Sequence, residues 1–194
     1  MSREDYLNEF DELHLLGEEL ISKSQDEAVR TLEDLFIHAY LLGRRHVCDE
    51  LDEGDWAYFD ELMRSREEAQ KMQETIYLKI DDKDFEDRVR EYIAAGDVNR
   101  LNTVISTEYH RDYNAGGESL AENYSDKHGV KLNKQWFTML DDRVRDTHDY
   151  LESTIVPLGE DFYTYDDDHA PYPGMFEKAS NNCNCRCWVS YLTA

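Results

Sequence analysis

Apolar residues recur at helical intervals through the first 82 residues of the chain. One stripe lies near the N-terminus, a second runs from Asp26 to Gly43, and a third follows the segment DEGD at 52–55. Aspartate is a good N-cap, so Asp55 is expected to begin the third helix. These stripes predict an N-terminal helical arm over residues 1–82, whose apolar faces pack in a core.

Capping residues mark the segments that follow. Asp84 is expected to cap a short helix that ends at Gly96, and Asp97 is expected to cap the next one. NAGG at 114–117 predicts a turn, because paired glycines punctuate helical patterns. A further helix after this turn is expected to stop at Gly129.

Beyond residue 130 the pattern changes from helical to extended. KQWFTML at 134–140 suits a strand, and TIVPLGEDFYTY at 154–165 mixes β-branched and aromatic residues around a proline and a glycine, which predicts an edge hairpin. DDDHAPYPGMF at 166–176 is typical of a loop, and CRCWVSYL at 185–192 alternates as a closing strand would.

Together these elements predict an α+β fold that is mainly α-helical. The segment KIDDKD at 79–84 is the expected joint between two parts. We therefore predict a helical arm over residues 1–82, which docks on a partner, and a small C-terminal α+β module over residues 83–194, which contains a short antiparallel sheet.

Acidic residues outnumber basic ones by 44 to 21, which gives a formal net charge of −23. Nucleic acid and anionic membranes repel such a chain unless it carries a local basic surface. The longest apolar run, LFIHAYLLG at 35–43, is too short to span a bilayer, and the charged N-terminus is unlike a signal peptide. We therefore expect a soluble protein that is made in the cytoplasm, has reduced thiols and has no membrane partner. Its acidic, lysine-poor composition also suits salt adaptation, which composition alone does not decide.

Basic residues gather locally in the second half of the chain. Lys127, Lys131 and Lys134 stand close to Arg143 and Arg145 in a segment with few acids. These lysines are candidates for contact with nucleic acid, or equally with an acidic protein partner.

Three of the four cysteines alternate in NNCNCRC, at positions 183, 185 and 187. On a strand, alternate residues share one face, so Cys185 and Cys187 are expected to face His148, with Cys183 or Asp146 as a fourth ligand. Thiolate and imidazole ligands suit one structural zinc ion, which would be the only cofactor. The alternative is a set of small buried cysteines with His148 hydrogen-bonded in the core. A disulfide between neighbours on one strand face has poor geometry.

Charged residues crowd the segment that precedes His148. We interpret them as an ion-paired network that pins a strand to the following helix and carries no catalysis, because no nucleophile and base accompany them. The predicted structural network comprises Trp136, Asp142, Arg143, Arg145 and Asp146.

Several motifs in a fixed order resemble the phage head-morphogenesis family, whose members are minor head proteins similar to protein F of phage Mu. The matching stretches are TEYHRDYN at 107–114, the long segment KQWFTML…PYPGMF at 134–176, and NNCNCRCWVSYL at 181–192. The resemblance covers about residues 84–194. A glycine that the family usually has after its H-x-x-L motif is missing, and Glu152 and Ser153 stand there instead.

This resemblance implies a non-enzymatic structural protein of a tailed virus. Such a protein is a low-copy component of the virion that lies inside the head near the portal, after assembly in the host cytoplasm. The portal and other head proteins are the implied partners, and head assembly and DNA packaging or delivery are the implied roles. Two alternatives stay open: a zinc-dependent hydrolase or nuclease that uses His148 and the C-terminal cysteines, and a nucleic-acid-binding accessory protein that uses the basic segment from Lys127 to Arg145.

Overall fold

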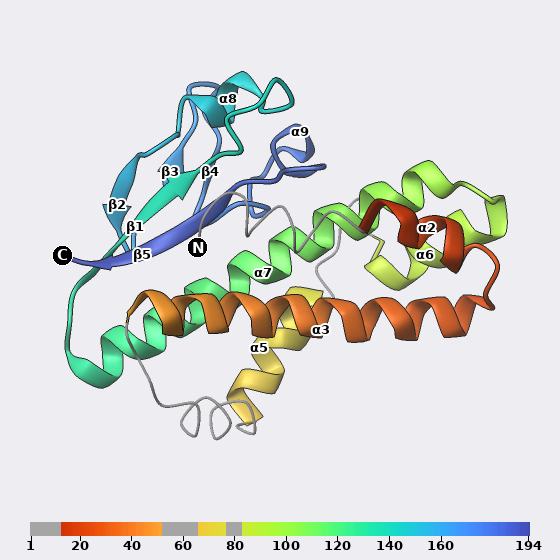
Figure 1. Cartoon of the computed structure of the whole chain (residues 1–194), viewed down its shortest axis with the longest axis horizontal. Coiled ribbons are helices and arrows are strands. Elements are labelled where there is room, and N and C mark those ends of the chain that lie inside the picture. The colour runs from red at the N-terminus through yellow and green to blue at the C-terminus, as the bar shows by residue number, and fades with distance from the viewer. Residues whose placement is uncertain (1–12, 52–65, 77–82) are drawn as a thin grey trace.

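Helices dominate the structure, as the sequence predicts (Figure 1). This computed structural model describes residues 13–51, 66–76 and 83–194. None of the described helices is long and apolar enough to cross a membrane. The helices are α2 (Leu13–Leu20), α3 (Gln25–Glu50), α5 (Arg66–Ile76), α6 (Phe85–Ala95), α7 (Val98–His128), α8 (Asp146–Asp149) and α9 (Ala179–Asn182).

The predicted boundaries of α6 and α7 hold at the residues expected to cap them. The Asp84 and Asp97 side chains accept hydrogen bonds from backbone N–H groups in the first turns of α6 and α7. Gly96 and Gly129 end the same helices in the left-handed conformation, with φ of 66° and 63°. The helix predicted to begin at Asp55 lies partly outside the described residues, and its described part is α5.

The predicted turn at NAGG is wrong, because α7 continues through residues 114–117 without a break. Its glycines serve helix packing instead of chain reversal. A Cβ atom on Gly116 would lie 1.9 Å from the carbonyl oxygen of Tyr40, and one on Gly43 would lie 1.8 Å from that of Tyr113. The backbones of α3 and α7 therefore cross at a distance that only glycine permits.

Two antiparallel sheets follow the helices in the sequence. The first has the strand order β2-β1-β5, with β1 at Leu132–Phe137, β2 at Ile155–Pro157 and β5 at Trp188–Thr193. The second pairs β3 (Phe162–Tyr163) with β4 (His169–Ala170). The predicted strands at 134–140 and 185–192 are thus confirmed in type, but the hairpin predicted at 154–165 is wrong, because its two halves pair with different strands.

Helix α7 connects two hydrophobic cores. Along its first half it lies beside α3, and Leu32 and Phe36 share a core with Leu101 and Ile105 (Figure 1). Along its second half it carries Leu120 and Ala121 into a core with the sheet. The described helices of residues 1–82 thus pack on α7, and their role as a separate docking arm stays a prediction.

Replacing Gly116 by alanine is expected to lower the free energy of unfolding by about 1–3 kcal/mol, because the added methyl group forces α3 and α7 apart. This loss should appear even though alanine is the better helix former. Gly159→Ala is the matched control, since a Cβ atom there meets nothing within 4 Å. Urea unfolding monitored by circular dichroism measures both variants, and equal stability of the two would refute the close crossing.

Candidate metal centre

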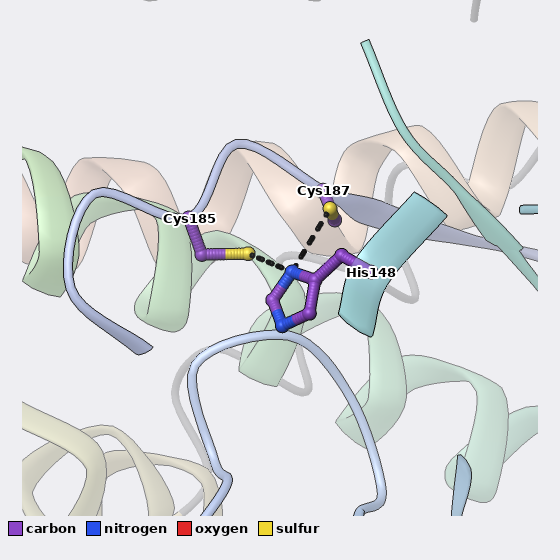
Figure 2. A group of neighbouring side chains, drawn as sticks. All are labelled: His148, Cys185 and Cys187. Carbon is purple, nitrogen blue, oxygen red and sulfur yellow. Dashed lines mark hydrogen bonds between the residues drawn. The ribbon is translucent and has the colours of Figure 1, made fainter. Parts of the chain in front are cut away.

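His148, Cys185 and Cys187 converge at one buried point (Figure 2). Nδ1 of His148 lies 3.4 Å from Sγ of Cys185 and 3.5 Å from Sγ of Cys187. The exposed fractions of the three residues are 1%, 4% and 3%, in the same order. Among the described residues, this is the group of His, Cys, Asp and Glu side chains whose ligand atoms lie close enough to share an ion.

The chain reaches this arrangement by a route that differs from the predicted one. Residues 183–187 precede β5, which starts at Trp188, so strand alternation does not place the cysteines. Asn184 instead adopts φ of 54°, a left-handed conformation that asparagine tolerates better than most residues. Cys185 and Cys187 then face His148, whereas Cys183 is exposed and stands outside the group.

Aromatic rings surround His148. The ring of Trp136 meets the imidazole edge-on at a centroid distance of 5.3 Å, and the ring of Phe176 lies 5.2 Å away. Trp136 also packs against Phe162 and lies in the second core. The Nε2 atom of His148 is buried and has no hydrogen-bond partner among the described residues.

The two buried thiols influence each other's ionisation. A hydrogen bond from Cys187 holds the pKa of Cys185 well below its usual range, against the effect of burial, and His148 lowers it further. Burial raises the pKa of Cys187 well above its usual range, and the neighbouring Cys185 adds to the rise. The pair therefore favours a thiolate on Cys185, which is the form that binds metal ions.

A small cavity of about 10 Å³ adjoins the three side chains. That volume is close to the minimum that holds one water molecule. The cavity is lined by residues of the loop before α8 and of the cysteine segment. Besides the three converging residues, they are Met139, Arg143, Val144, Arg145, Asn184 and Arg186.

Of the predicted charged network, Arg145 joins two segments through hydrogen bonds and not through ion pairs, and Asp142 and Asp146 take no such part. Arg145 donates hydrogen bonds of 2.7 Å and 2.6 Å to the carbonyl oxygens of Asn181 and Cys183. Asp142 and Asp146 are exposed, and no ion pair joins either one to the described part of the chain. Surface carboxylates are well hydrated, so they contribute little to the stability of the fold. Arg143 is exposed too and lines the small cavity.

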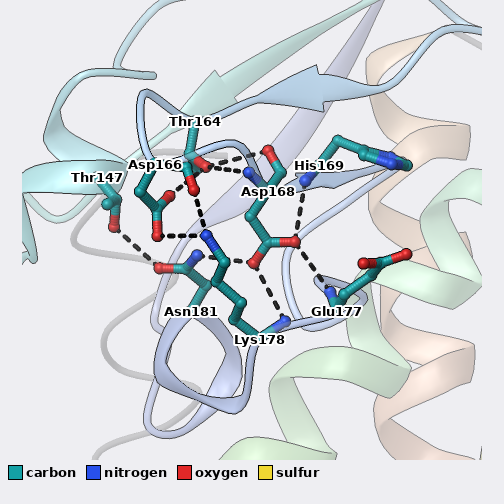
Figure 3. A network of polar contacts seen from close by, with 8 residues as sticks. All are labelled: Thr147, Thr164, Asp166, Asp168, His169, Glu177, Lys178 and Asn181. Atoms are coloured by element: carbon teal, nitrogen blue, oxygen red, sulfur yellow. Dashed lines mark hydrogen bonds and ion pairs between the residues drawn. The ribbon is translucent and has the colours of Figure 1, made fainter.

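Asp168, and not the predicted Asp142, is the buried aspartate that holds neighbouring segments of the C-terminal module together (Figure 3). It is 1% exposed, and its carboxylate accepts hydrogen bonds from the backbone N–H groups of His169, Glu177 and Lys178. Asn181 donates a fourth bond of 2.8 Å. Burial by itself raises the pKa of Asp168, but these hydrogen bonds outweigh it, so the pKa lies below its ordinary value. The run of three aspartates at 166–168 concealed which of them turns inward.

Helix α7 buries a second set of charges that the sequence analysis did not assign to any site. Glu108 and Arg111 form an ion pair at 0% and 1% exposure, and Arg88 joins Glu108 at 2.8 Å. Arg111 also donates to the carbonyl oxygen of Thr75 at 2.7 Å, which ties α7 to α5. Burial raises the pKa of Asp112 well above its usual range. The sequence TEYHRDYN could have indicated these buried charges, because its charged residues lie on every face of one helical stretch and some must therefore face the core.

Lys134 is not a surface contact, which corrects the predicted basic face. It is 0% exposed because alternate residues of β1 point into the core, and its Nζ lies 2.7 Å from Oε1 of Glu118. Lys127 and Lys131 are exposed, as predicted. The basic face is thus smaller than the sequence suggested, and Lys134 serves a buried ion pair.

Comparison with known proteins identifies what this chain is similar to. The family model described as Phage Mu protein F like protein matches residues 80–190. The minor head protein GP7 of Bacillus phage SPP1 is 35% identical over 93 residues, which are 48% of this chain and 30% of that protein. An NAD(+)--arginine ADP-ribosyltransferase, EFV, of Enterococcus faecalis is 37% identical over 59 residues, which are 30% of this chain and 12% of that protein. The chain thus covers well under half of either relative. No solved structure matches it significantly.

The Asp168→Asn variant is expected to lose about 2–4 kcal/mol of unfolding free energy at neutral pH, because an amide cannot accept all four hydrogen bonds. Because folding lowers the pKa of this carboxyl group, its contribution to stability is present above the ordinary aspartate pKa of about 3.9 and is lost as the pH falls through the folded-state value. The variant should therefore show a flatter fall in stability on the acid side.

Asp167→Asn is the matched control for Asp168→Asn. Asp167 is exposed and has φ of 59°, a conformation that asparagine also adopts. Urea unfolding from neutral to acidic pH compares wild type and both variants. Parallel acid limbs for all three proteins would contradict the anchoring role of Asp168.

Proposed function

The chain belongs to the family of Phage Mu protein F like proteins, and from this premise we propose that it is a minor head protein that lies inside the head of a tailed virus near the portal. Head assembly and DNA packaging or delivery are its proposed roles. The observation that carries the proposal is the extent of the family match: residues 80–190 include every element from α6 to α9 and half of β5. The similarity to a minor head protein over 48% of the chain supports it.

A structural role without catalysis fits the geometry of the Cys/His cluster. The three side chains are at most 4% exposed, and the cavity beside them measures about 10 Å³. A phosphoester or peptide substrate needs a far larger pocket. The similarity to an ADP-ribosyltransferase covers only 12% of that enzyme and therefore gives little support to a transferase activity in this chain.

Protein partners suit the surface better than nucleic acid does. The net charge is −23, and one of the three candidate lysines is buried in an ion pair. Large apolar side chains that are more than half exposed, by contrast, gather on the C-terminal module. Within the described residues they are Leu140, Tyr150, Ile155, Tyr163 and Tyr165, with Leu15 on α2.

Two of these tyrosines form a pair that suits a protein contact. Tyr150 and Tyr165 are 63% and 58% exposed, and their rings meet edge-on at 5.9 Å. Tyrosine is enriched at protein interfaces because it combines a large apolar ring with a polar tip. We therefore place the contact with other head proteins on this tyrosine pair, and not on the apolar face of the arm, which α7 already covers.

Purified particles of the virus, complemented with tagged chain, test the proposal. Quantitative mass spectrometry should find the wild type in few copies per head. The double variant Tyr150→Ser/Tyr165→Ser should be incorporated at least about thirtyfold less, since an interface hot spot contributes about 2 kcal/mol or more. Leu15→Ser is the matched control, because Leu15 is 57% exposed on α2, and it should be incorporated normally.

The outcomes separate the two parts of the proposal. Absence of the wild-type chain from purified heads, with presence only in infected cells, would contradict the head location. Normal incorporation of the tyrosine variant together with loss of Leu15→Ser would leave the head location intact and move the contact to the arm.

A further inference from the structure

The Cys/His cluster has the geometry of a metal centre, and this inference does not depend on the proposed function. We propose that Nδ1 of His148 and the Sγ atoms of Cys185 and Cys187 (Figure 2) bind one Zn²⁺ ion, whose fourth ligand is a water molecule in the adjoining cavity.

The spacing of the ligand atoms supports a tetrahedral ion. Zinc binds sulfur at about 2.3 Å and histidine nitrogen at about 2.0–2.1 Å, so a tetrahedron places nitrogen and sulfur about 3.6 Å apart. The observed distances from Nδ1 of His148 are 3.4 Å and 3.5 Å. Both nitrogen–sulfur distances therefore agree with those of a tetrahedral zinc site.

A single hydrogen bond at Nδ1 of His148 does not require both sulfur atoms to approach it. Nδ1 of His148 carries either one proton or one lone pair in the ring plane, so it serves one partner well. Both sulfur atoms nevertheless lie at almost equal distances from it. A metal ion at this point would bind all three atoms at once.

The surrounding side chains hold the ligands in place before any ion binds. Arg145 donates to the carbonyl oxygens of Asn181 and Cys183, and Thr147 donates to the Asn181 side chain at 3.0 Å. These bonds join the segment that carries His148 to the segment that carries the cysteines. Metal sites depend on such outer contacts, because a displacement of the ligands by about 1 Å costs much of the affinity.

The choice of zinc follows from the ligand atoms. Two thiolates and one imidazole are soft or borderline ligands, which suit Zn²⁺ and exclude Mg²⁺ and Ca²⁺. The three ligands carry a charge of −2 as two thiolates, which neutralises the ion. A neutral centre of this kind can lie in the aromatic surroundings of Trp136 and Phe176 without a large desolvation cost.

The fourth position distinguishes this proposal from the site predicted from the sequence. Cys183 and Asp146 are exposed and lie outside the group, so neither supplies the fourth ligand. The cavity of about 10 Å³ has room for about one water molecule. A water ligand is typical of catalytic zinc, but the small cavity leaves little room for a substrate here, so we assign the ion a structural role.

Elemental analysis of the full chain, purified without a histidine tag, tests the proposal. The wild type should contain about one zinc per chain. Cys185→Ser and Cys187→Ser should lose it, while Cys183→Ser, the matched control, should keep it. Circular dichroism establishes which variants are folded.

Two measurements on the wild type keep the test valid if the variants do not fold. Chelation of the zinc should lower Tm by roughly 5 °C or more, and added zinc should restore it. Cobalt in place of zinc should give the absorption of a tetrahedral site with thiolate ligands. Loss of zinc in Cys183→Ser would overturn the proposed ligand set, and a metal-free wild type that fails to take up zinc or cobalt would overturn the site itself.

Discussion

The side-chain amide of Asn114 fixes the relation between the two halves of the molecule. It lies at 2% exposure in the middle of α7, where its Nδ2 atom donates to the carbonyl oxygen of Cys187 and its Oδ1 atom accepts from the N–H of Val189, both at 3.2 Å. One amide thus satisfies the backbone on both sides of Trp188, at the start of β5. Because Cys187 is held there, the cysteine segment is fixed relative to the helix as well as to the sheet. The close crossing of α3 at Gly116, half a turn further along α7, leaves this helix little freedom to shift.

Buried ion pairs extend the same constraint along α7. Glu118 accepts from Lys134 and from the hydroxyl group of Tyr191, which lie on β1 and β5, while Glu108 pairs with Arg88 on α6. Burial raises the pKa of Glu118, and Lys134 offsets part of that rise. Replacing such pairs by apolar side chains is often neutral or stabilising, so they are weak evidence for stability. Each pair nevertheless joins α7 to one particular residue of a neighbouring element, which constrains how that element is placed along the helix.

Local signals in the sequence predicted what depends on local chemistry. Aspartate caps and terminal glycines gave the ends of α6 and α7 because those interactions span three or four residues. The errors arose where tertiary contacts decide. Gly116 predicts a turn when the sequence is considered alone, because the sequence does not show that α3 packs against it. Likewise, nothing in the run of aspartates at 166–168 shows which carboxylate accepts the buried backbone hydrogen bonds. Ser153 has φ of 63°, a left-handed conformation, near the position where the family usually has glycine.

The candidate site was predicted in composition but not in geometry, and the same tertiary contacts explain the difference. His148, Cys185 and Cys187 meet because Asn184 turns the chain and because Asn114 and Arg145 hold it, none of which follows from alternation in NNCNCRC.

The distribution of charge also differs between the interior and the surface. The charged residues buried within the described part of the chain balance, with Arg44, Arg88, Arg111 and Lys134 against Glu108, Asp112, Glu118 and Asp168. The formal excess of −23 therefore lies outside this interior. A surface with that excess repels nucleic acid, which agrees with the proposed contacts to other proteins through uncharged groups such as the exposed tyrosines.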